Sequence, residues 1–364
     1  MEQPHKKRVT VAMSGGVDSS VAAACLLEQG YEVIGLTMRL WSEEGGTRAR
    51  RACCATEDVY DARRVAQTLG IPFFVVDLEA EFRAAVVADF VTTYAAGQTP
   101  NPCIRCNQIL KFEHLLRKSH ELQAEFLATG HYALRTEGPS GPQLWRGQDR
   151  QKDQSYFLFT VTSDQLRHLR FPLGDLTKGQ TRALAERFGL HLAHKGESQD
   201  LCFVPDGDTA AFLARMGAGW FQPGPIVNLA GQVVGKHDGV GGYTIGQRKG
   251  LGIASATPLY VVAIEAAHHR LVVGPESALW RSMLQVREIN WLGDEPLLAP
   301  MRVGARIRYA AEAQPGWLRS TGAGCAKMVF DTPQRAIAPG QACVFYAAER
   351  VLGGGWIEPF EVGE

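Results

Sequence analysis

The chain has 364 residues, which at about 150 residues per domain predicts two or three domains. Its 45% hydrophobic and 21% charged residues are typical of a globular protein and exclude a disordered or fibrous one. Basic and acidic residues balance at 38 each, which excludes a chain that is basic throughout but leaves room for a local nucleic-acid-binding patch. With no long apolar run and no secretory signal, we expect a cytoplasmic protein without a membrane partner, whose eight cysteines are mostly reduced thiols.

The first third of the chain alternates strand and helix patterns. The expected elements are, in chain order, strand 9–13, helix 17–29, strand 31–38, helix 56–69, strand 71–78, helix 79–96 and strand 125–129. This alternation predicts an α/β fold with a doubly wound parallel sheet. Ligands of such sheets bind beyond the carboxyl ends of the strands, where Ser14, Met38 and Gly130 all lie.

Later residues change in character. Two helical stretches follow between residues 164 and 190, one of them starting at Thr177, and after residue 206 short Val-rich runs alternate with Gly, as in small antiparallel sheets. We expect three domains: a catalytic domain at 1–205, a small β-rich middle domain at 206–283 and a C-terminal β-barrel at 284–364.

A glycine-rich turn, Ser14-Gly-Gly-Val-Asp-Ser-Ser20, joins the first strand to the first helix. Two glycines allow a tight turn and a close approach to a ligand, and the helix N-terminus offers free N–H groups to phosphate. The hydroxyls of Ser19 and Ser20 suit phosphate oxygens, whereas Asp18 suits a magnesium ion that bridges phosphates, or a cap of the first helical turn. The turn therefore predicts phosphate binding.

Three cysteines lie in distinctive segments. Cys103 and Cys106 form a Cys-x-x-Cys pair before a helix expected to begin near Gln108, and Cys202 lies in Glu197-Ser-Gln-Asp-Leu-Cys-Phe-Val204. Three roles remain open for them besides that of buried, inert thiols: a zinc site, an iron–sulfur cluster on all three thiols, or persulfide chemistry between two of them. A thiol near a helix N-terminus is the better nucleophile, which favours Cys106.

The remaining cysteines carry less signal. Cys25, Cys325 and Cys343 lie in helical or β-rich sequence and are expected in the core. Cys53 and Cys54 follow the basic run 48–51, which we expect in a solvated or RNA-facing loop.

The loop Ser14–Ser20 resembles the pyrophosphate-binding loop of the PP-loop ATP pyrophosphatases. With it come, in order, TPNPCIRCNQILKF at 99–112, ATGHYA at 128–133, KDQSYFL at 152–158, ESQDLCFV at 197–204, YTIGQRKGLG at 243–252 and APGQACVFY at 338–346. This set covers almost the whole chain and resembles the bacterial tRNA-uridine 2-sulfurtransferases within that superfamily.

The resemblance implies ATP-dependent 2-thiolation of the wobble uridine of a tRNA anticodon. ATP, with Mg²⁺, would adenylylate the C2 oxygen, and a persulfide would then deliver sulfur, with release of AMP and pyrophosphate. Cys106 matches the catalytic nucleophile and Cys202 the persulfide carrier. The positions that match ATP-binding residues are Ala12, Met13, Ser14, Gly15, Gly16, Val17, Asp18, Ser19, Met38 and Gly130.

The resemblance also implies RNA contacts. Asn101, Pro102 and Cys103 match the segment that faces the target base. The positions that match tRNA-contacting residues are His131, Lys152, Asp153, Gln154, Arg308, Tyr309 and Gln341. Some members of the family have Asp in place of Cys103, where a carboxylate can serve in acid or base steps, so the role of Cys103 stays open.

Two rival functions follow from the same residues: an adenylating synthetase that acts on a small molecule, and an RNA-binding protein whose loop is a relic. Basic residues around the loop, such as Arg39, Arg105 and Lys152, could line an RNA-binding face. A protein that donates sulfur is expected as a partner. The sequence determines neither that donor, nor the tRNA species, nor the oligomeric state.

Overall fold

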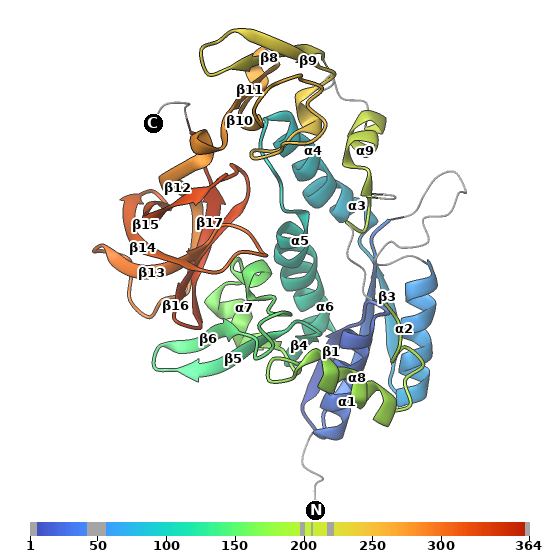
Figure 1. The fold of residues 1–364 in the computed structure, drawn as a ribbon. Helices are drawn as coiled ribbons and strands as arrows, with labels where there is room; N and C mark the ends of the chain where they lie inside the picture. The colour runs from blue at the N-terminus through green and yellow to red at the C-terminus, as the bar shows by residue number, and fades with distance from the viewer. Residues whose placement is uncertain (1–5, 42–55, 197–200, 205–206, 217–221, 361–364) are drawn as a thin grey trace, which may run out of the picture. The chain divides into compact units, whose positions relative to one another are not determined.

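The computed structural model describes residues 6–41, 56–196, 201–204, 207–216 and 222–360 (Figure 1). The chain divides into two compact units. The first comprises Met1–Val86, Cys103–Gly207 and Glu349–Val351, and the second comprises Val87–Pro102, Asp208–Ala348 and Leu352–Glu364. Each unit has a hydrophobic core of its own.

A five-stranded parallel sheet forms the centre of the first unit. Its strands, in spatial order, are β3 (Phe73–Asp77), β2 (Glu32–Arg39), β1 (Arg8–Ala12), β4 (Phe126–Thr129) and β7 (Leu169–Arg170). Such strands are buried on both faces, which is why β1 reads as an uninterrupted apolar run whose Val9 and Val11 are fully buried. The strand order reverses between β1 and β4, and this reversal is where open α/β sheets bind their ligands.

The first unit also contains helical segments. They are α1 (Val17–Glu28), α2 (Thr56–Leu69), α3 (Glu79–Phe82), η1 (Arg83–Val87), α5 (Pro102–Arg105), η2 (Cys106–Leu115), α6 (Leu116–Glu121), η3 (Ser155–Leu158), α7 (Ser163–His168) and α8 (Lys178–Arg187). Helix α1 contacts both α2 and α8, whereas α6 packs beside β4 (Figure 1). Alanines at 22–24 are almost completely buried, which allows α1 to approach its neighbours closely.

A hairpin that the sequence analysis did not anticipate follows β4. Its strands are β5 (Ala133–Gly138) and β6 (Gly141–Arg146), which pair in antiparallel register. Arg350 and Val351, which also belong to the first unit, pair with Trp145 and Leu144 of β6.

The second unit contains a small sheet and a closed barrel. The small sheet, in spatial order, consists of β10 (Tyr260–Glu265), β11 (Arg270–Gly274), β8 (Gly224–Asn228) and β9 (Val233–His237). Two helices, α4 (Ala88–Ala95) and α9 (Thr209–Arg215), belong to the same unit, where Phe90 packs on Phe212 with ring centroids 6.0 Å apart. Short single turns are η5 (Val240–Gly242), η6 (Ala266–His268) and η7 (Glu276–Leu279).

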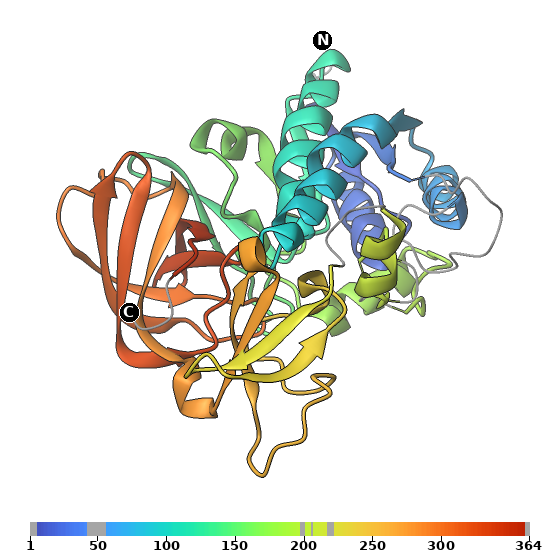
Figure 2. The ribbon, with the colours of Figure 1, turned by 90° about the horizontal axis from the view of Figure 1, so that it is seen from above.

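The barrel has six antiparallel strands, drawn in orange and red in Figure 2. They are β12 (Trp280–Trp291), β13 (Met301–Arg306), β14 (Gln314–Gly322), β15 (Cys325–Arg335), β16 (Ala342–Ala347) and β17 (Arg350–Ile357). Pairing of β12 with both β15 and β17 closes the barrel, so that neither of these strands is left as an open edge.

The expected fold class is confirmed: a parallel α/β sheet is followed by a small β-rich part and a C-terminal barrel. The expected domain boundaries at 205/206 and 283/284 stay predictions. Among the described residues, none of the helices is long and apolar enough to cross a membrane.

One expected helix start is wrong. The helix that carries the Cys-x-x-Cys pair begins at Pro102 rather than near Gln108, because proline is well suited to a first helical position, where its missing N–H has no partner to lose.

Candidate functional site

The glycine-rich loop lies at the carboxyl end of β1, as the sequence predicts. Gly15 has φ +71°, and a Cβ atom there would lie 2.3 Å from the carbonyl oxygen of Asp58, so only glycine fits. Gly16 is the N-cap of α1 and has no side chain with which to cap it. The first N–H groups of α1 are therefore not covered by a capping side chain, which suits them to bind an anion.

Serine hydroxyls hold the loop in shape. Ser19 Oγ accepts from the Ser14 N–H at 3.1 Å and donates to the Gly16 carbonyl at 3.2 Å. Ser20 is fully buried and donates to the same carbonyl at 2.8 Å. Ser19 and Ser20 are thus both buried and stabilise the turn from inside, whereas Ser14 stays partly exposed.

Two other predicted nucleotide residues lie beside this loop. Gly130 directly follows β4, and a Cβ atom there would lie 2.7 Å from the backbone nitrogen of Ser19. Met38 is buried near the end of β2, the other neighbour of β1, while the hydroxyl of the preceding Thr37 donates to the Met13 carbonyl at 2.7 Å. The structure therefore gathers these predicted positions at the carboxyl edge of three adjacent strands.

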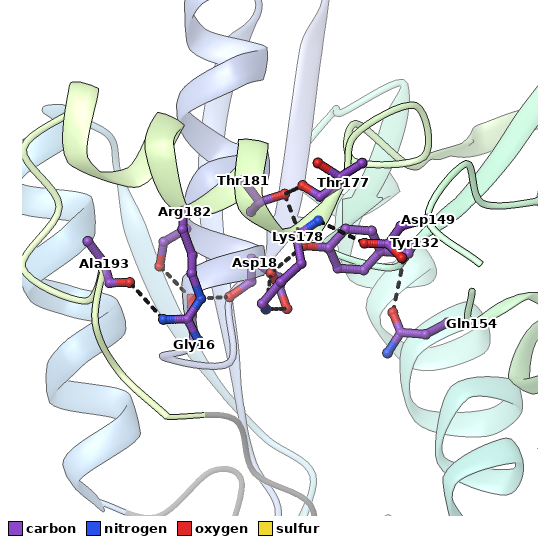
Figure 3. Close-up of polar contacts among 12 residues, drawn as sticks. Gly16, Asp18, Tyr132, Asp149, Gln154, Thr177, Lys178, Thr181, Arg182 and Ala193 are labelled. Carbon is purple, nitrogen blue, oxygen red and sulfur yellow. Dashed lines mark hydrogen bonds and ion pairs between the residues drawn. The ribbon is translucent and has the colours of Figure 1, made fainter. Parts of the chain in front are cut away.

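Lys178 adds a cation that the sequence analysis missed (Figure 3). Its Nζ lies 2.7 and 2.8 Å from the two carboxylate oxygens of Asp18, whose Oδ1 also accepts from the Tyr132 hydroxyl at 2.9 Å. The predicted helix start at Thr177 is confirmed as a capping box with Gln180, and it places Lys178 at the first helical position. Nothing in the sequence links Lys178 to Asp18, because 160 residues separate them.

A second lysine holds the other end of the loop. Lys195 Nζ donates to the Gly15 carbonyl at 2.9 Å and to the carboxylates of Asp58 and Asp61 at 2.6 and 2.7 Å. Burial alone would raise the pKa of Asp61, but hydrogen bonds from Lys195 and His191 lower it overall. Burial opposes protonation of Lys195, yet its two carboxylate partners raise the pKa of the amine. Both ends of the loop are thus fixed by amines from later in the chain.

These contacts bear on the expected magnesium ion. Asp18, the candidate ligand, already accepts from Lys178 with both oxygens, so it could bind a cation directly only if Lys178 moved away. Within the described ranges, no group of three or more His, Cys, Asp or Glu side chains is arranged to hold a metal ion. The residues at the loop would therefore fit an ion held mainly by the phosphates of a nucleotide.

The helix start at Pro102 changes the surroundings of the paired thiols. Cys103 lies in the first turn and is exposed, whereas Cys106 lies one turn further and is half-buried. Because the favourable field of a helix N-terminus fades beyond the first turn, it acts more on Cys103 than on Cys106. Asn107, which follows Cys106, is buried and donates to the Phe157 carbonyl at 3.1 Å, which fixes this part of the helix.

Cys202 belongs to the same unit as Cys103 and Cys106 and is half-buried. The next residue, Phe203, packs edge-on against Phe82 with ring centroids 5.6 Å apart, which anchors this segment. Residues 197–200, which open the motif around Cys202, lie outside the described residues.

The other cysteines follow the expectation only in part. Cys343 is fully buried, and burial raises the pKa of its thiol. Cys25 is half-buried, and burial together with Glu28 raises its pKa. Cys325 is half-buried as well, and Cys53, Cys54 and the basic run 48–51 lie outside the described residues.

His131, a predicted tRNA contact, is buried beside the carboxyl edge of β1, β2 and β4, where the predicted nucleotide residues lie. This edge is called the nucleotide edge below. Its Nδ1 lies 2.7 Å from the Thr129 hydroxyl, and its ring packs against Phe112 and Phe171. Burial, and to a lesser degree the charge of Lys111, lowers the pKa of His131 well below its ordinary value. The imidazole is therefore neutral at neutral pH.

The predicted contacts at 152–154 differ from one another. Asp153 is 1% exposed, and its carboxylate accepts from Arg146 Nε at 3.0 Å and from two backbone N–H groups. Gln154 Oε1 accepts from the backbone of Tyr132 at 3.0 Å, and Lys152 is half-buried. The structure thus gives Asp153 an internal role, while RNA contact by all three stays a prediction.

In the second unit, Arg308 and Tyr309 lie between β13 and β14. The Arg308 guanidinium donates to the carbonyls of Arg335 and Ala336 and lines a cavity of about 420 Å³. Tyr309 is 36% exposed. Gln341 donates to two carbonyls of the segment that precedes Asn101 and Pro102. The predicted RNA contacts of Arg308, Tyr309 and Gln341 stay predictions.

Comparison with known families agrees with this architecture. Residues 7–206 match the family described as tRNA methyl transferase HUP domain. Residues 210–275 match the tRNA methyl transferase PRC-barrel domain, and residues 281–357 match the aminomethyltransferase beta-barrel domain. The fold and its nucleotide edge therefore define a HUP-domain protein of the class that carries a PRC-barrel and a β-barrel behind the HUP domain.

Named relatives identify the family within this class. The chain is 60% identical over 359 residues to the tRNA-specific 2-thiouridylase MnmA of Magnetococcus marinus, covering 98% of this chain and 100% of that protein. It is 51% identical to MnmA of Paracoccus denitrificans, covering 97% of this chain and 92% of that protein. The chain belongs to the tRNA-specific 2-thiouridylase family, as the motifs indicate.

A 4-thiouridine synthetase–RNA complex with bound ATP aligns with TM-score 0.37 and 17% identity over 57% of this chain and 50% of that one.

Proposed function

We propose that this protein is an ATP-dependent tRNA sulfurtransferase that replaces the C2 oxygen of the wobble uridine by sulfur. The observation that carries the proposal is the 60% identity, over the full length, to a tRNA-specific 2-thiouridylase. The nucleotide edge built from the loop 14–20, Met38 and Gly130 supports it, because replacing a carbonyl oxygen first requires that oxygen to become a leaving group.

In the first step, the uridine C2 oxygen attacks the α-phosphate of ATP and pyrophosphate leaves. The first N–H groups of α1 and the Ser14 hydroxyl would bind the phosphates, and the amine of Lys178 would balance their charge from the side of Asp18. Phosphate at this position would compete with Asp18 for Lys178. That exchange would leave the Asp18 carboxylate available to a magnesium ion on the phosphates.

In the second step, two thiols of the same unit would release one sulfur atom to the uridine. Attack of the Cys106 thiolate on the inner sulfur of a Cys202 persulfide would form a Cys106–Cys202 disulfide and release hydrosulfide. The hydrosulfide would add to C2 of the adenylylated uridine, and AMP would leave with the former C2 oxygen. The disulfide must then be reduced by two electrons from an external thiol, and a sulfur-donor protein must recharge Cys202.

RNA would be bound by the remaining predicted residues. Asn101, Pro102 and Cys103 would face the target uridine, and exposure of Cys103 is consistent with such a position. Some members of the family have a carboxylate in place of this thiol, so the part that Cys103 plays in acid and base steps stays open. The buried, neutral His131 would serve such RNA as a hydrogen-bonding rather than a charged group.

The test is conversion of unmodified tRNA. The protein, ATP, magnesium, a persulfide donor and tRNA are expected to yield 2-thiouridine, detected by mass spectrometry of the nucleosides. Cys106→Ser and Cys202→Ser should each abolish product, whereas Cys325→Ser, which changes a half-buried thiol of the barrel, should retain full activity. Full activity in both of the first two variants would refute the two-thiol mechanism.

The rival functions give different results in the same assay. A synthetase for a small molecule would exchange ATP with pyrophosphate without RNA, and an RNA-binding protein with a relic loop would release no AMP. Iron and visible absorbance after anaerobic purification would instead indicate a cluster on the three cysteines.

A further inference from the structure

A Pro-Gly turn at residues 338–341 of the second unit is hydrogen-bonded both to the barrel and to the segment before Asn101. The backbone N–H of Gln341 donates to the Ala338 carbonyl at 3.2 Å, and Gly340, the third residue of the turn, has φ +84°. Proline at the second position and glycine with positive φ at the third are the marks of a type II turn. The turn is fixed to β17, because Gly340 N–H donates to the Ile357 carbonyl and Ile357 N–H donates to the Gln341 carbonyl.

A carbonyl and a side-chain nitrogen of this turn contact residues 99 and 100. The Thr99 N–H donates to the Pro339 carbonyl at 2.8 Å. The Gln341 side-chain nitrogen donates to the carbonyls of Thr99 and Pro100 at 3.1 and 3.0 Å. Because Pro100 has no N–H, these three bonds engage all the backbone polar groups of the dipeptide.

Close packing reinforces the contact. A Cβ atom on Gly340 would lie 2.9 Å from Gln98 Cβ and 3.0 Å from the Thr99 carbonyl oxygen. At the other end of the segment, a Cβ atom on Gly97 would lie 2.8 Å from Ile264 Cγ2 of β10. Residues 97–100 are thus held between the small sheet and the barrel of the second unit.

From this geometry we propose that Gln341 is a positioning residue, which fixes residues 99–100 so that Asn101 and Pro102 present a preformed surface to the target base. Its side-chain nitrogen already donates to two carbonyls of the protein, and direct contact of Gln341 with tRNA is the alternative that the kinetics below distinguish. The function of the surface rests on the proposed tRNA thiolation, whereas the positioning itself does not depend on it.

Hydrogen exchange of the Thr99 amide tests the positioning without RNA or activity. Gln341→Met keeps the length of the side chain but removes both donors, and we expect exchange at Thr99 to become about tenfold faster. Gln232→Met, which removes a hydrogen bond to Asn228 on the small sheet, is the matched control and should leave Thr99 unchanged. Unchanged exchange in Gln341→Met would overturn the proposal.

Gly340→Ala tests the same contact from the backbone, since Gln341 keeps its donors. Its expected effect on Thr99 exchange is at least as large, because the new methyl group meets Gln98 and Thr99. Gly322→Ala carries similar strain, at φ +92° with nothing within 4 Å, and should not affect Thr99.

Kinetics separate positioning from direct RNA contact. For Gln341→Met we expect kcat at saturating tRNA to fall about tenfold, with the Kd for tRNA changed less than about twofold, because misplacement affects the reacting geometry rather than the encounter. A Kd raised about tenfold with kcat retained would instead identify Gln341 as an RNA contact. If no thiolation occurs even in the unsubstituted protein, the proposed function fails, while the exchange result still decides the positioning.

Discussion

Two glycine turns of this molecule are built alike but used differently. In the first unit, Gly15 has φ +71° and presses against the backbone of Asp58; in the second, Gly340 has φ +84° and presses against Thr99. The first turn leads into a helix whose N-cap, Gly16, has no side chain to cover the first N–H groups. The second turn uses its carbonyl and the neighbouring Gln341 amide on residues 99 and 100.

The difference between the two turns shows which observation separates a turn that binds a ligand from a turn that holds the fold together. Positive φ and close packing are common to both, so they show only that glycine is required. What distinguishes them is the use of the backbone polar groups: in the first turn the N–H groups of α1 have no capping side chain and are proposed to bind phosphate, whereas in the second they bond to another segment of the chain. A substitution in the first turn should therefore mainly weaken ligand binding. A substitution in the second should mainly increase the mobility of residues 99 and 100.

The largest effect is expected for Gly15→Ala. The methyl group would overlap the Asp58 carbonyl, so we expect the free energy of unfolding to fall by about 2–4 kcal/mol and ATP affinity to fall at least about tenfold. Urea unfolding and calorimetric titration with ATP measure the two quantities.

The control for this substitution is Gly30→Ala, after α1. There φ is +89° but nothing lies within 4 Å, so only the backbone strain of about 1 kcal/mol applies. Equal losses at both positions would show that packing against Asp58 is unimportant for the loop.

A smaller effect is expected from the pair Asp18 and Lys178. Their side chains are 33% and 14% exposed, so a double-mutant cycle with Asp18→Asn and Lys178→Met should give a coupling energy of about 1–2 kcal/mol. The cycle is measured by urea unfolding without nucleotide. If Lys178 also balances phosphate charge, the single Lys178→Met change should weaken ATP binding, and Asp18→Asn should not restore it.

Glu28 and Arg187 provide a matched pair in the same unit. Their N···O distance is also 2.7 Å, but the side chains are 57% and 54% exposed, and the expected coupling is below about 0.5 kcal/mol. A coupling of equal size in both pairs would contradict the role given to burial at the loop.

The smallest effect concerns pH and His131 at the nucleotide edge. Because burial lowers its pKa in the folded protein below the ordinary 6.5, the unfolded chain binds a proton that the folded one excludes as pH falls below that value. Stability should therefore decrease, from this group alone, as the pH falls below about 6.5. Urea unfolding at several pH values should show a flatter dependence for His131→Asn.

Replacement of the exposed His194 by Asn is the control for losing one imidazole, and its pH dependence should match that of the unsubstituted protein. Identical slopes for His131→Asn and the unsubstituted protein would show that His131 is not excluded from protonation in the folded state.

Much of the fold could be read from the sequence because its signals are local. The apolar run 9–13, the loop 14–20 and the helix start at Thr177 all depend on neighbouring residues, and each lies in or beside the expected element. The predicted start of the cysteine helix is wrong, since Pro102 begins the helix although prolines at 100 and 102 are also typical of a turn. Predicted RNA contacts such as Asp153 carried no sign that they are buried.

By itself, the sequence determined the glycine-rich turn and the alternation of strands and helices up to β4, because steric limits of glycine and apolar periodicity act over a few residues. Only the tertiary structure decided which distant groups meet. Lys178 reaches Asp18 across 160 residues, and Gln341 reaches Thr99 across 242. Such pairings have no characteristic spacing, since they arise when separately formed elements pack and bring charges and unsatisfied carbonyls together.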